Sequence, residues 1–227
     1  MGSDYTKEKG KQNMNTEKFA SRLDHTLLDK DHTAAEVDRV VEEATRYGTN
    51  VCLPPSRLDR VPDGFGGEVV AVVGFPHGTS TPETKAYEAR EALDGGATEV
   101  DVACNVSALL SGEKDRFIRD LREVAETGAT TKAILETGLL DDEQKRRAAR
   151  LSVEAGADYV KTCTGYAPGE ATVEDVRLLC DAVGDEARVK ASGGIRDAET
   201  ALRMLEAGAS RIGASSGATL VQEYEDI

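Results

Sequence analysis

The feature that most constrains this chain is an alternation of short extended segments with helical segments, repeated eight times. Consecutive strands joined by helices form parallel sheets, and eight such units in one domain favour a closed barrel. We therefore predict an α/β fold with a single (β/α)8 TIM barrel. The predicted strands cover residues 22–26, 50–53, 69–75, 99–105, 132–137, 159–163, 188–192 and 211–215.

The segments between the predicted strands have helical periodicity and end in glycine. One apolar face within residues 33–48 recurs at helical spacing, and Gly48 follows it. Its members are Val37, Val40, Val41 and Ala44. Residues 56–65 carry a weaker pattern, which fits either a short helix or a loop. We expect the apolar helix faces to pack on the outside of the barrel.

The beginning of the chain differs from the rest. Residues 1–18 are polar and lack the apolar core of a secretory signal. We predict a flexible N-terminal tail over residues 1–18, followed by one barrel domain over residues 19–227. No apolar run approaches the length of a membrane span, so we expect no membrane contact.

The formal net charge of −14 restricts the partners of the chain. Nucleic acids and anionic membranes are bound through clustered Lys and Arg, so we expect neither as a partner. An acidic surface of this kind is either ordinary solvated surface or an adaptation to a salt-rich cytoplasm. These two readings stay open at the level of sequence.

The cysteines and histidines show no metal-binding pattern. Four cysteines form no CxxC pair, and the three histidines share no ligand spacing. We expect free thiols in a reducing cytoplasm, with no metal and no cofactor. The cysteines are Cys52, Cys104, Cys163 and Cys180.

Two predicted strands carry a lysine where a buried apolar residue is expected. Lys161 lies in "YVKTCTG" and Lys190 in "RVKASGG", and each is flanked by residues that must face the helices. Both side chains are therefore predicted to point into the barrel. Asp101 in "EVDVACN" follows the same alternation. Buried charges of this kind are costly unless they compensate one another, and they are expected at sites of chemistry.

A lysine inside a barrel can attack a carbonyl and form a Schiff base if its amine is neutral. A second ammonium nearby disfavours protonation of the first. Because predicted strands six and seven are neighbours, one lysine can serve as the nucleophile while the other keeps it neutral. The alternative is that Asp101 or Glu136 simply neutralises each lysine. Asp101 is also the candidate for moving a proton to and from a substrate hydroxyl.

Other polar residues surround this predicted site. Lys132 and Glu136 are read as supporting charges on the fifth strand, and Asp24 and Thr26 at the end of the first strand could bind hydroxyls. The last two strands lead into "SGGIRDAET" and "GASSGATL", where small residues and backbone N–H groups can bind phosphate, as TIM barrels commonly do there. The phosphate candidates are Gly165, Gly193, Gly194, Gly213, Ser215 and Ser216.

These motifs together resemble those of the deoxyribose-phosphate aldolases, a family of class I aldolases. The resemblance runs from about residue 20 to about residue 220 and includes "LDHTLL", "EVDVACNVSALLSG", "KAILETGLL", "YVKTCTGYAPGEATVEDV", "VKASGGIRD" and "RIGASSG". It implies reversible cleavage of 2-deoxy-D-ribose 5-phosphate to glyceraldehyde 3-phosphate and acetaldehyde, without metal.

The resemblance also assigns roles to residues. It implies that Lys161 forms the Schiff base, that Lys190 perturbs it and that Asp101 relays protons, while the GASSG and SGG turns hold the phosphate. A homo-oligomer, dimer or tetramer, is the expected assembly, and a small phosphorylated sugar is the expected substrate. Two alternatives stay open: a class I aldolase with a different acceptor, and a non-catalytic barrel that binds phosphosugars.

Overall fold

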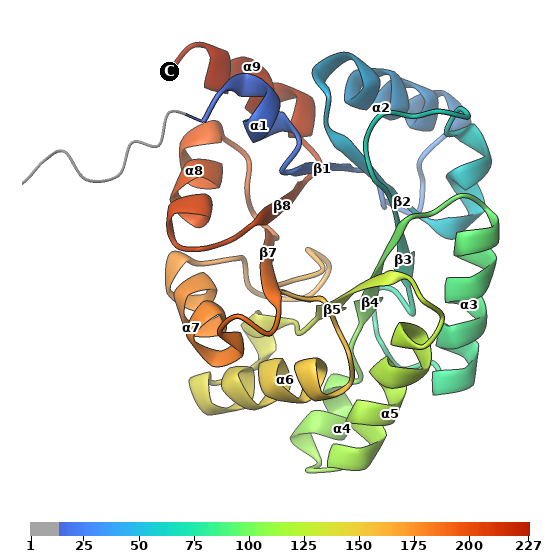
Figure 1. The fold of residues 1–227 in the computed structure, drawn as a ribbon, viewed down its shortest axis with the longest axis vertical. Coiled ribbons are helices and arrows are strands. Elements are labelled where there is room, and N and C mark those ends of the chain that lie inside the picture. The colour runs from blue at the N-terminus through green and yellow to red at the C-terminus, as the bar shows by residue number, and fades with distance from the viewer. Residues whose placement is uncertain (1–13) are drawn as a thin grey trace, which may run out of the picture.

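The computed structural model describes residues 14–227, which form one closed barrel of eight parallel strands (Figure 1). Each strand pairs with the next in chain order, and β8 pairs with β1 to close the ring. The predicted (β/α)8 barrel is confirmed. The strands are β1 Leu23–Thr26, β2 Asn50–Leu53, β3 Val69–Val73, β4 Glu99–Ala103, β5 Thr130–Ile134, β6 Tyr159–Lys161, β7 Arg188–Ser192 and β8 Arg211–Ala214.

Helices surround this barrel on the outside (Figure 1). They are α1 Thr16–Ala20, α2 Ala34–Tyr47, α3 Pro82–Asp94, α4 Val106–Leu110, α5 Lys114–Ala125, α6 Asp142–Glu154, α7 Val173–Val183, α8 Ala198–Glu206 and α9 Gly217–Glu225. Two short 3-10 helices, η1 Pro55–Arg60 and η2 Thr137–Leu139, follow β2 and β5. The weak signal in residues 56–65 thus corresponds to a short 3-10 helix of six residues and the loop after it. Over residues 14–227, no helix has the length and apolar character needed to cross a membrane.

Local sequence explains the limits of α2. The Thr33 side chain accepts a hydrogen bond from the backbone N–H of Glu36, and the Glu36 carboxylate accepts one from the N–H of Thr33 at 2.7 Å. This reciprocal pair satisfies two N–H groups that have no partner within the helix. Gly48 ends the helix at φ 70°, where a side chain would be strained. The predicted apolar face is buried against the barrel.

Helix α1 departs from the predicted boundary between tail and domain. Residues 1–13 lie outside the described residues, but Thr16–Ala20 form a helix whose first turn falls within the predicted tail. The Asn15 side chain caps this turn by accepting a hydrogen bond from the N–H of Lys18 at 2.9 Å. Phe19 is fully buried and stacks on Tyr224 of α9, with ring centroids 4.2 Å apart. This packing extends the ordered domain to the N-terminal side of residue 19.

The interior of the barrel is divided into an apolar side and a charged side. On β2 and β3, Cys52, Val70 and Val72 form a small buried cluster against Leu28 and Phe75. The remaining strands send charged side chains inward. A separate and larger apolar core lies between the outer faces of the strands and the helices. The predicted alternation, with apolar residues facing the helices and charged residues facing inward, is therefore confirmed for Asp101, Lys132, Lys161 and Lys190.

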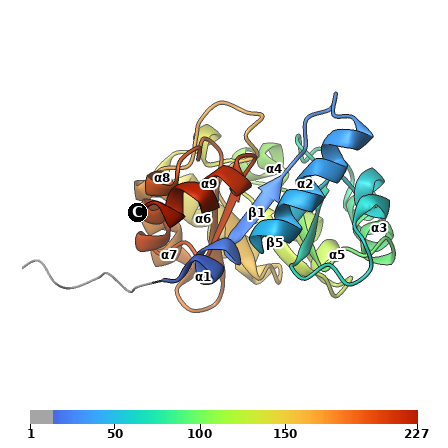
Figure 2. The ribbon, with the colours of Figure 1, turned by 90° about the horizontal axis from the view of Figure 1, so that it is seen from above.

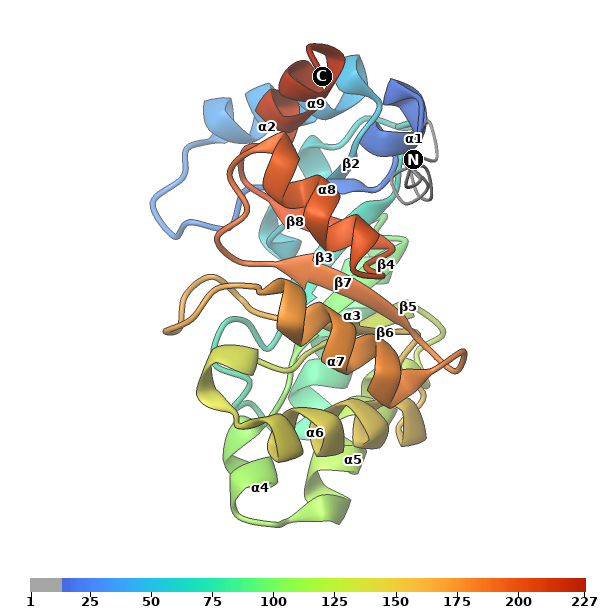
Figure 3. The same ribbon diagram turned by 90° about the vertical axis from the view of Figure 1, so that its left-hand side faces the viewer.

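The loops that follow the strands gather at one end of the barrel. In Figure 2 and Figure 3 the loop after β1, in blue, and the loop after β6, in orange, project from the same end, with α1 toward the other. In a parallel barrel this end lies beyond the carboxyl ends of all eight strands, and it is where barrel enzymes place their sites.

Candidate active site

Seven charged side chains meet inside the barrel, and all are buried. Their exposed fractions range from 0% for Asp24, Asp101, Lys132 and Lys190 to 8% for Arg211. Burial at this level would be prohibitive for isolated charges, so each group must be judged by its partners. We call these seven the interior charge cluster: Asp24, Glu99, Asp101, Lys132, Lys161, Lys190 and Arg211.

Asp101 is the hub of the interior charge cluster. Its Oδ2 accepts hydrogen bonds from Lys161 Nζ and Lys190 Nζ, each at 2.7 Å. Lys132 Nζ lies 3.1 Å from the other oxygen, Oδ1. Burial disfavours the ionised form of Asp101, but the three lysines outweigh burial and hold the pKa of this carboxyl well below its usual range. Asp101 is therefore a carboxylate shared among three cations.

Lys161 and Lys190 lie side by side, as the sequence predicts. They are register partners on β6 and β7, and both bond to the same Asp101 oxygen. Lys190 also donates to Asp24. Although burial opposes its charge, the two carboxylates raise the pKa of Lys190 above its ordinary value. Lys190 is thus held as an ammonium next to Lys161.

A second layer of the interior charge cluster lies toward the amino ends of the strands. Arg211, the first residue of β8, reaches Asp24 Oδ1 at 2.7 Å and Glu99 Oε1 at 3.2 Å. Lys132 Nζ lies 2.6 Å from the other Glu99 oxygen. Asn50 adds a 3.0 Å hydrogen bond to Asp24. Both oxygens of Asp24 are therefore engaged by protein groups, and its role in binding substrate hydroxyls stays a prediction.

Glu136 does not join the interior charge cluster. Strand β5 ends at Ile134, two residues before it, and Glu136 adopts φ 58° and ψ 60° in the left-handed region. Its carboxylate accepts hydrogen bonds from the backbone N–H of Thr164 at 3.0 Å and from the Thr164 hydroxyl at 2.6 Å. The prediction that Glu136 is a supporting charge beside the lysines is corrected: it fixes the loop after β6.

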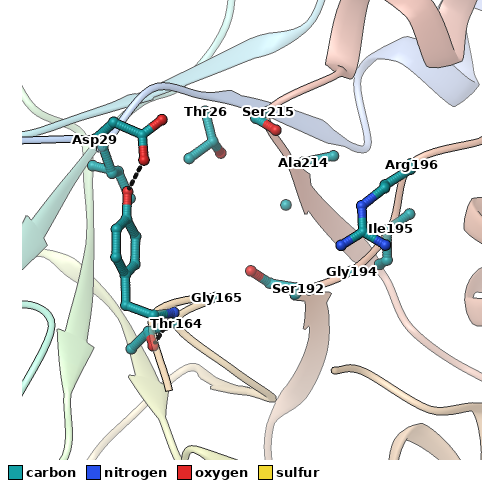
Figure 4. A pocket seen from close by; sticks show the side chains of 14 residues that line it. Thr26, Asp29, Thr164, Gly165, Ser192, Gly194, Ile195, Arg196, Ala214 and Ser215 are labelled. Carbon is teal, nitrogen blue, oxygen red and sulfur yellow. Dashed lines mark hydrogen bonds between the residues drawn. The ribbon is translucent and has the colours of Figure 1, made fainter. Parts of the chain in front are cut away.

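A cavity of about 240 Å³ opens at the carboxyl end of the barrel. Figure 4 shows Arg196 and Asp29 on opposite sides of it, with Thr26, Ser192 and Ser215 between them. Thr26 thus lies where the sequence predicts, although its hydroxyl donates to the backbone carbonyl of Asp24 at 2.8 Å. Five of the six phosphate candidates line this cavity: Gly165, Gly193, Gly194, Gly213 and Ser215.

The two glycine-rich turns contribute differently to the cavity. Ser215 and Ser216 lead directly into α9, whose first turn has no side-chain cap. Ser216 itself does not line the cavity, and its hydroxyl is buried. Gly193 and Gly194, at φ 101° and 77°, form a turn that precedes α8. The Asp197 carboxylate already caps α8, so this turn, and not the helix start, presents its backbone to the cavity.

Arg196 and Tyr166 are among the residues of this cavity that were not predicted from the sequence. Arg196 is the one basic side chain among the lining residues, and it pairs with Glu170 at 3.0 Å on the exposed rim. Tyr166 donates from its hydroxyl to Asp29 at 2.9 Å, which ties the loop after β6 to the loop after β1. The arginine inside "SGGIRD" was a visible signal, since phosphate sites commonly use arginine. Nothing local to Tyr166 predicts its partner, 137 residues away.

A second, more apolar cavity of about 730 Å³ adjoins the first over β2 and β3. It shares Leu28, Asp29 and Tyr166 with the first cavity. Tyr166 also packs edge-on against Phe75, with ring centroids 5.3 Å apart. The hydrogen bond between Tyr166 and Asp29 therefore stands in the wall between the two cavities.

Comparison with known proteins places this geometry in a family. The model of the DeoC/LacD family aldolases matches residues 19–222. The chain belongs to this family. The chain is 46% identical over 213 residues to a deoxyribose-phosphate aldolase of Staphylococcus saprophyticus, covering 91% of this chain and 97% of the relative. A deoxyribose-phosphate aldolase of Geobacillus sp. is 47% identical, with 90% and 95% covered.

Solved structures of DeoC/LacD relatives have the same fold. An aldolase designated QR15 superposes with a TM-score of 0.89 at 37% identity, covering 92% of this chain and 96% of that one. The deoxyribose phosphate aldolase of Aeropyrum pernix, described as a tetramer, gives a TM-score of 0.86 at 34% identity, with 93% and 92% covered. The aldolase resemblance drawn from the motifs is thereby confirmed.

Proposed function

We propose that this chain catalyses the reversible cleavage of 2-deoxy-D-ribose 5-phosphate into D-glyceraldehyde 3-phosphate and acetaldehyde. The observation that carries the proposal is the pair of lysines on one carboxylate oxygen, beneath a cavity lined by glycine-rich turns and one arginine. Relatives named deoxyribose-phosphate aldolase support the substrate. A cavity of about 240 Å³ is of the right order for a small sugar phosphate.

In the proposed mechanism Lys161 is the nucleophile. Its neutral amine attacks C1 of the open-chain sugar, and loss of water gives an iminium. Lys190 stays charged between Asp24 and Asp101 and disfavours a second ammonium at Lys161. Because a Schiff base supplies the electron sink, the reaction requires no metal and no cofactor.

Bond cleavage then needs a base near C3. Asp101 removes the proton of the C3 hydroxyl, through a water molecule, as the C2–C3 bond breaks and the electrons move into the iminium. The resulting enamine of acetaldehyde takes up a proton and is hydrolysed, which frees Lys161. Arg196, Ser215 and the backbone of the Gly193–Gly194 turn hold the phosphate meanwhile.

The proposal extends to assembly and location. We propose a homo-oligomer, for which the tetramer of the Aeropyrum relative is the support. We also propose a cytoplasmic enzyme, which fits the free thiols of the four cysteines.

The test is an assay that detects both products. Wild-type protein incubated with 2-deoxy-D-ribose 5-phosphate should yield acetaldehyde and glyceraldehyde 3-phosphate in equal amounts, and the yield should survive EDTA. Lys161→Met should reduce the rate by at least 10³-fold, a loss on the scale seen when an activated nucleophile is removed. Products from other phosphosugars but not from this one would indicate a class I aldolase with a different acceptor. Binding without products would indicate a non-catalytic barrel.

A further inference from the structure

The interior charge cluster contains more positive groups than negative ones. If every group is ionised, three carboxylates face four cations, and the cluster carries one excess positive charge. A buried cluster is more stable when its charges balance. The excess disappears when one lysine gives up its proton. Within residues 14–227, Lys161 has one carboxylate partner and each of the other three cations has two, so the Lys161 ammonium is the least compensated.

The groups that face Lys161 come from nearly every strand. Besides the cluster, the barrel interior holds Cys52 on β2 and Tyr159 on β6, and β3 contributes only valines. Burial raises the pKa of Cys52 to about 11, so this thiol is neutral in the working range. Glu136 is turned away to Thr164. The charges that act on Lys161 are therefore the members of the cluster.

Lys132 and Glu99 do not bond to Lys161, but they affect how strongly the negative charge of Asp101 stabilises the Lys161 ammonium. Lys132 stands between two carboxylates, 2.6 Å from Glu99 and 3.1 Å from Asp101. Lys132 therefore competes with Lys161 for electrostatic stabilisation by Asp101. Glu99 offsets this competition because it partly neutralises Lys132. Arg211 of β8 forms ion pairs with both Glu99 and Asp24. Lys132 and Glu99 thus act on Lys161 with opposite sign.

We propose that Glu99 and Lys132 are positioning residues that set the charge balance of the barrel interior and thereby the pH at which Lys161 becomes a free amine. This inference rests on the proposed function and adds to the pair formed by Lys161 and Lys190. The residues that line the 240 Å³ cavity include no member of the interior charge cluster. Lys132 is linked to Lys161 through their common partner Asp101, and Glu99 is linked to it through Lys132. Their effect on the nucleophile passes through Asp101 and through the net charge of the cluster.

The test measures the pH dependence of Schiff-base formation. Acetaldehyde and cyanoborohydride are added to wild-type and variant protein, and the initial rate of labelling at Lys161 is followed by peptide mass spectrometry from pH 5 to pH 9. Lys132→Met removes a neighbouring positive charge, so the acidic limb of the profile should move up by about one pH unit. Glu99→Gln removes a negative charge, so the limb should move down by a similar amount.

The double variant Lys132→Met/Glu99→Gln separates charge from structure. The double variant has the same excess of one positive charge as the wild type. The acidic limb of its labelling profile should therefore lie within about 0.3 pH unit of the wild-type limb, even if its labelling rate is lower. Purely structural roles would lower the rate at every pH and leave all three limbs in place. That result, or two single variants that shift in the same direction, would overturn the proposal.

A matched control comes from a buried ion pair outside the barrel. Lys85 Nζ lies 2.6 Å from Asp120 between α3 and α5, and both side chains are buried. Lys85→Met/Asp120→Asn should destabilise the fold without moving the limb. Failure of the proposed Schiff-base mechanism would look different from failure of the inference, because no protein, wild-type included, would then be labelled at Lys161. A class I aldolase with a different acceptor would still be labelled there, and the product assay above identifies it.

Discussion

At the scale of single residues, the proposed chemistry depends on one ammonium that stays charged. Lys190 bonds to Asp24 and Asp101, and these carboxylates hold its pKa above the ordinary value despite burial. The side-chain nitrogens of Lys161 and Lys190 both bond to one oxygen of Asp101, which keeps them close together. A single carboxylate cannot neutralise two ammonium groups.

Replacing Lys190 tests this charge directly. Lys190→Leu should move the acidic limb of the pH–rate profile upward by one to two units, which corresponds to roughly 1.4–2.7 kcal/mol. Part of the lost activity should return at higher pH. Lys190→Arg retains the charge and should shift the limb less, although its rate falls because the fork of the guanidinium does not fit the site. A uniform loss at every pH in Lys190→Leu would mean that Lys190 only orients its neighbours.

The space for Lys190 is provided by Gly213. A Cβ placed on Gly213 would lie 3.0 Å from Lys190 Cε and 3.1 Å from the Ser192 hydroxyl oxygen. Gly213→Ala should therefore displace Lys190 and lower kcat by roughly tenfold, since small misplacements at an active site are costly. Gly66→Ala is the matched control because its Cβ would meet no neighbouring atom. Equal kinetics for the two variants would show that the contact is without effect.

At the scale of elements, the proposed phosphate site is divided between the turn after β7 and the start of α9. Uncapped N–H groups at the start of α9 favour an anion, while the Gly193–Gly194 turn and Arg196 approach from β7. Arg196 is held on the rim by Glu170, an exposed pair that costs little to break.

Replacing Arg196 should therefore affect phosphorylated substrate selectively. We expect Arg196→Leu to raise KM for 2-deoxy-D-ribose 5-phosphate about tenfold or more, with little change in KM for unphosphorylated deoxyribose. Glu170→Gln frees Arg196 and should lower KM for the phosphorylated sugar. Steady-state kinetics with both sugars measure this difference. An equal change for both sugars would place the phosphate elsewhere.

The elements also show how far sequence reasoning reaches. Alternation predicted that Asp101, Lys161 and Lys190 face inward because side-chain direction in a strand follows directly from residue parity. The same rule gave a wrong direction for Glu136 because β5 ends at Ile134. Glu136 itself adopts a left-handed backbone conformation, which turns its side chain away from the lysines. Strand ends are set by pairing and by loop contacts, which a local pattern does not contain.

Contacts between residues far apart in the chain could not be predicted from the sequence either. Asp24 meets Lys190 and Arg211, which lie 166 and 187 residues further along the chain, only because β8 closes on β1. Sequence placed Asp24 at a strand end, where a role in hydroxyl binding was reasonable. Its actual partners depend on closure and register of the barrel, and these require the three-dimensional structure.

At the scale of the whole molecule, the interior charge cluster makes folding depend on pH. The pKa values of Asp24 and Asp101 are lowered in the folded protein: burial acts against ionisation, but the neighbouring cations outweigh it. A carboxyl with a lowered folded pKa stabilises the protein above its unfolded pKa, near 3.8, and loses that contribution as pH falls below it.

We therefore expect the thermal midpoint to be nearly constant from pH 8 to pH 5 and to fall steeply below about pH 4. Carboxylates at helix caps, such as Asp197, have lowered pKa values and add to the same trend. Differential scanning calorimetry over this range provides the measurement. A midpoint that stays constant down to pH 3 would mean that the buried carboxylates do not contribute in this way.

The central claim is that Lys161 alone is the nucleophile among the three lysines that share Asp101. The most direct measurement is borohydride reduction in the presence of 2-deoxy-D-ribose 5-phosphate, followed by digestion and mass mapping of the modified peptide. We expect loss of activity together with one reduced adduct on Lys161. An adduct on Lys190 or Lys132, with Lys161 unmodified, would contradict it.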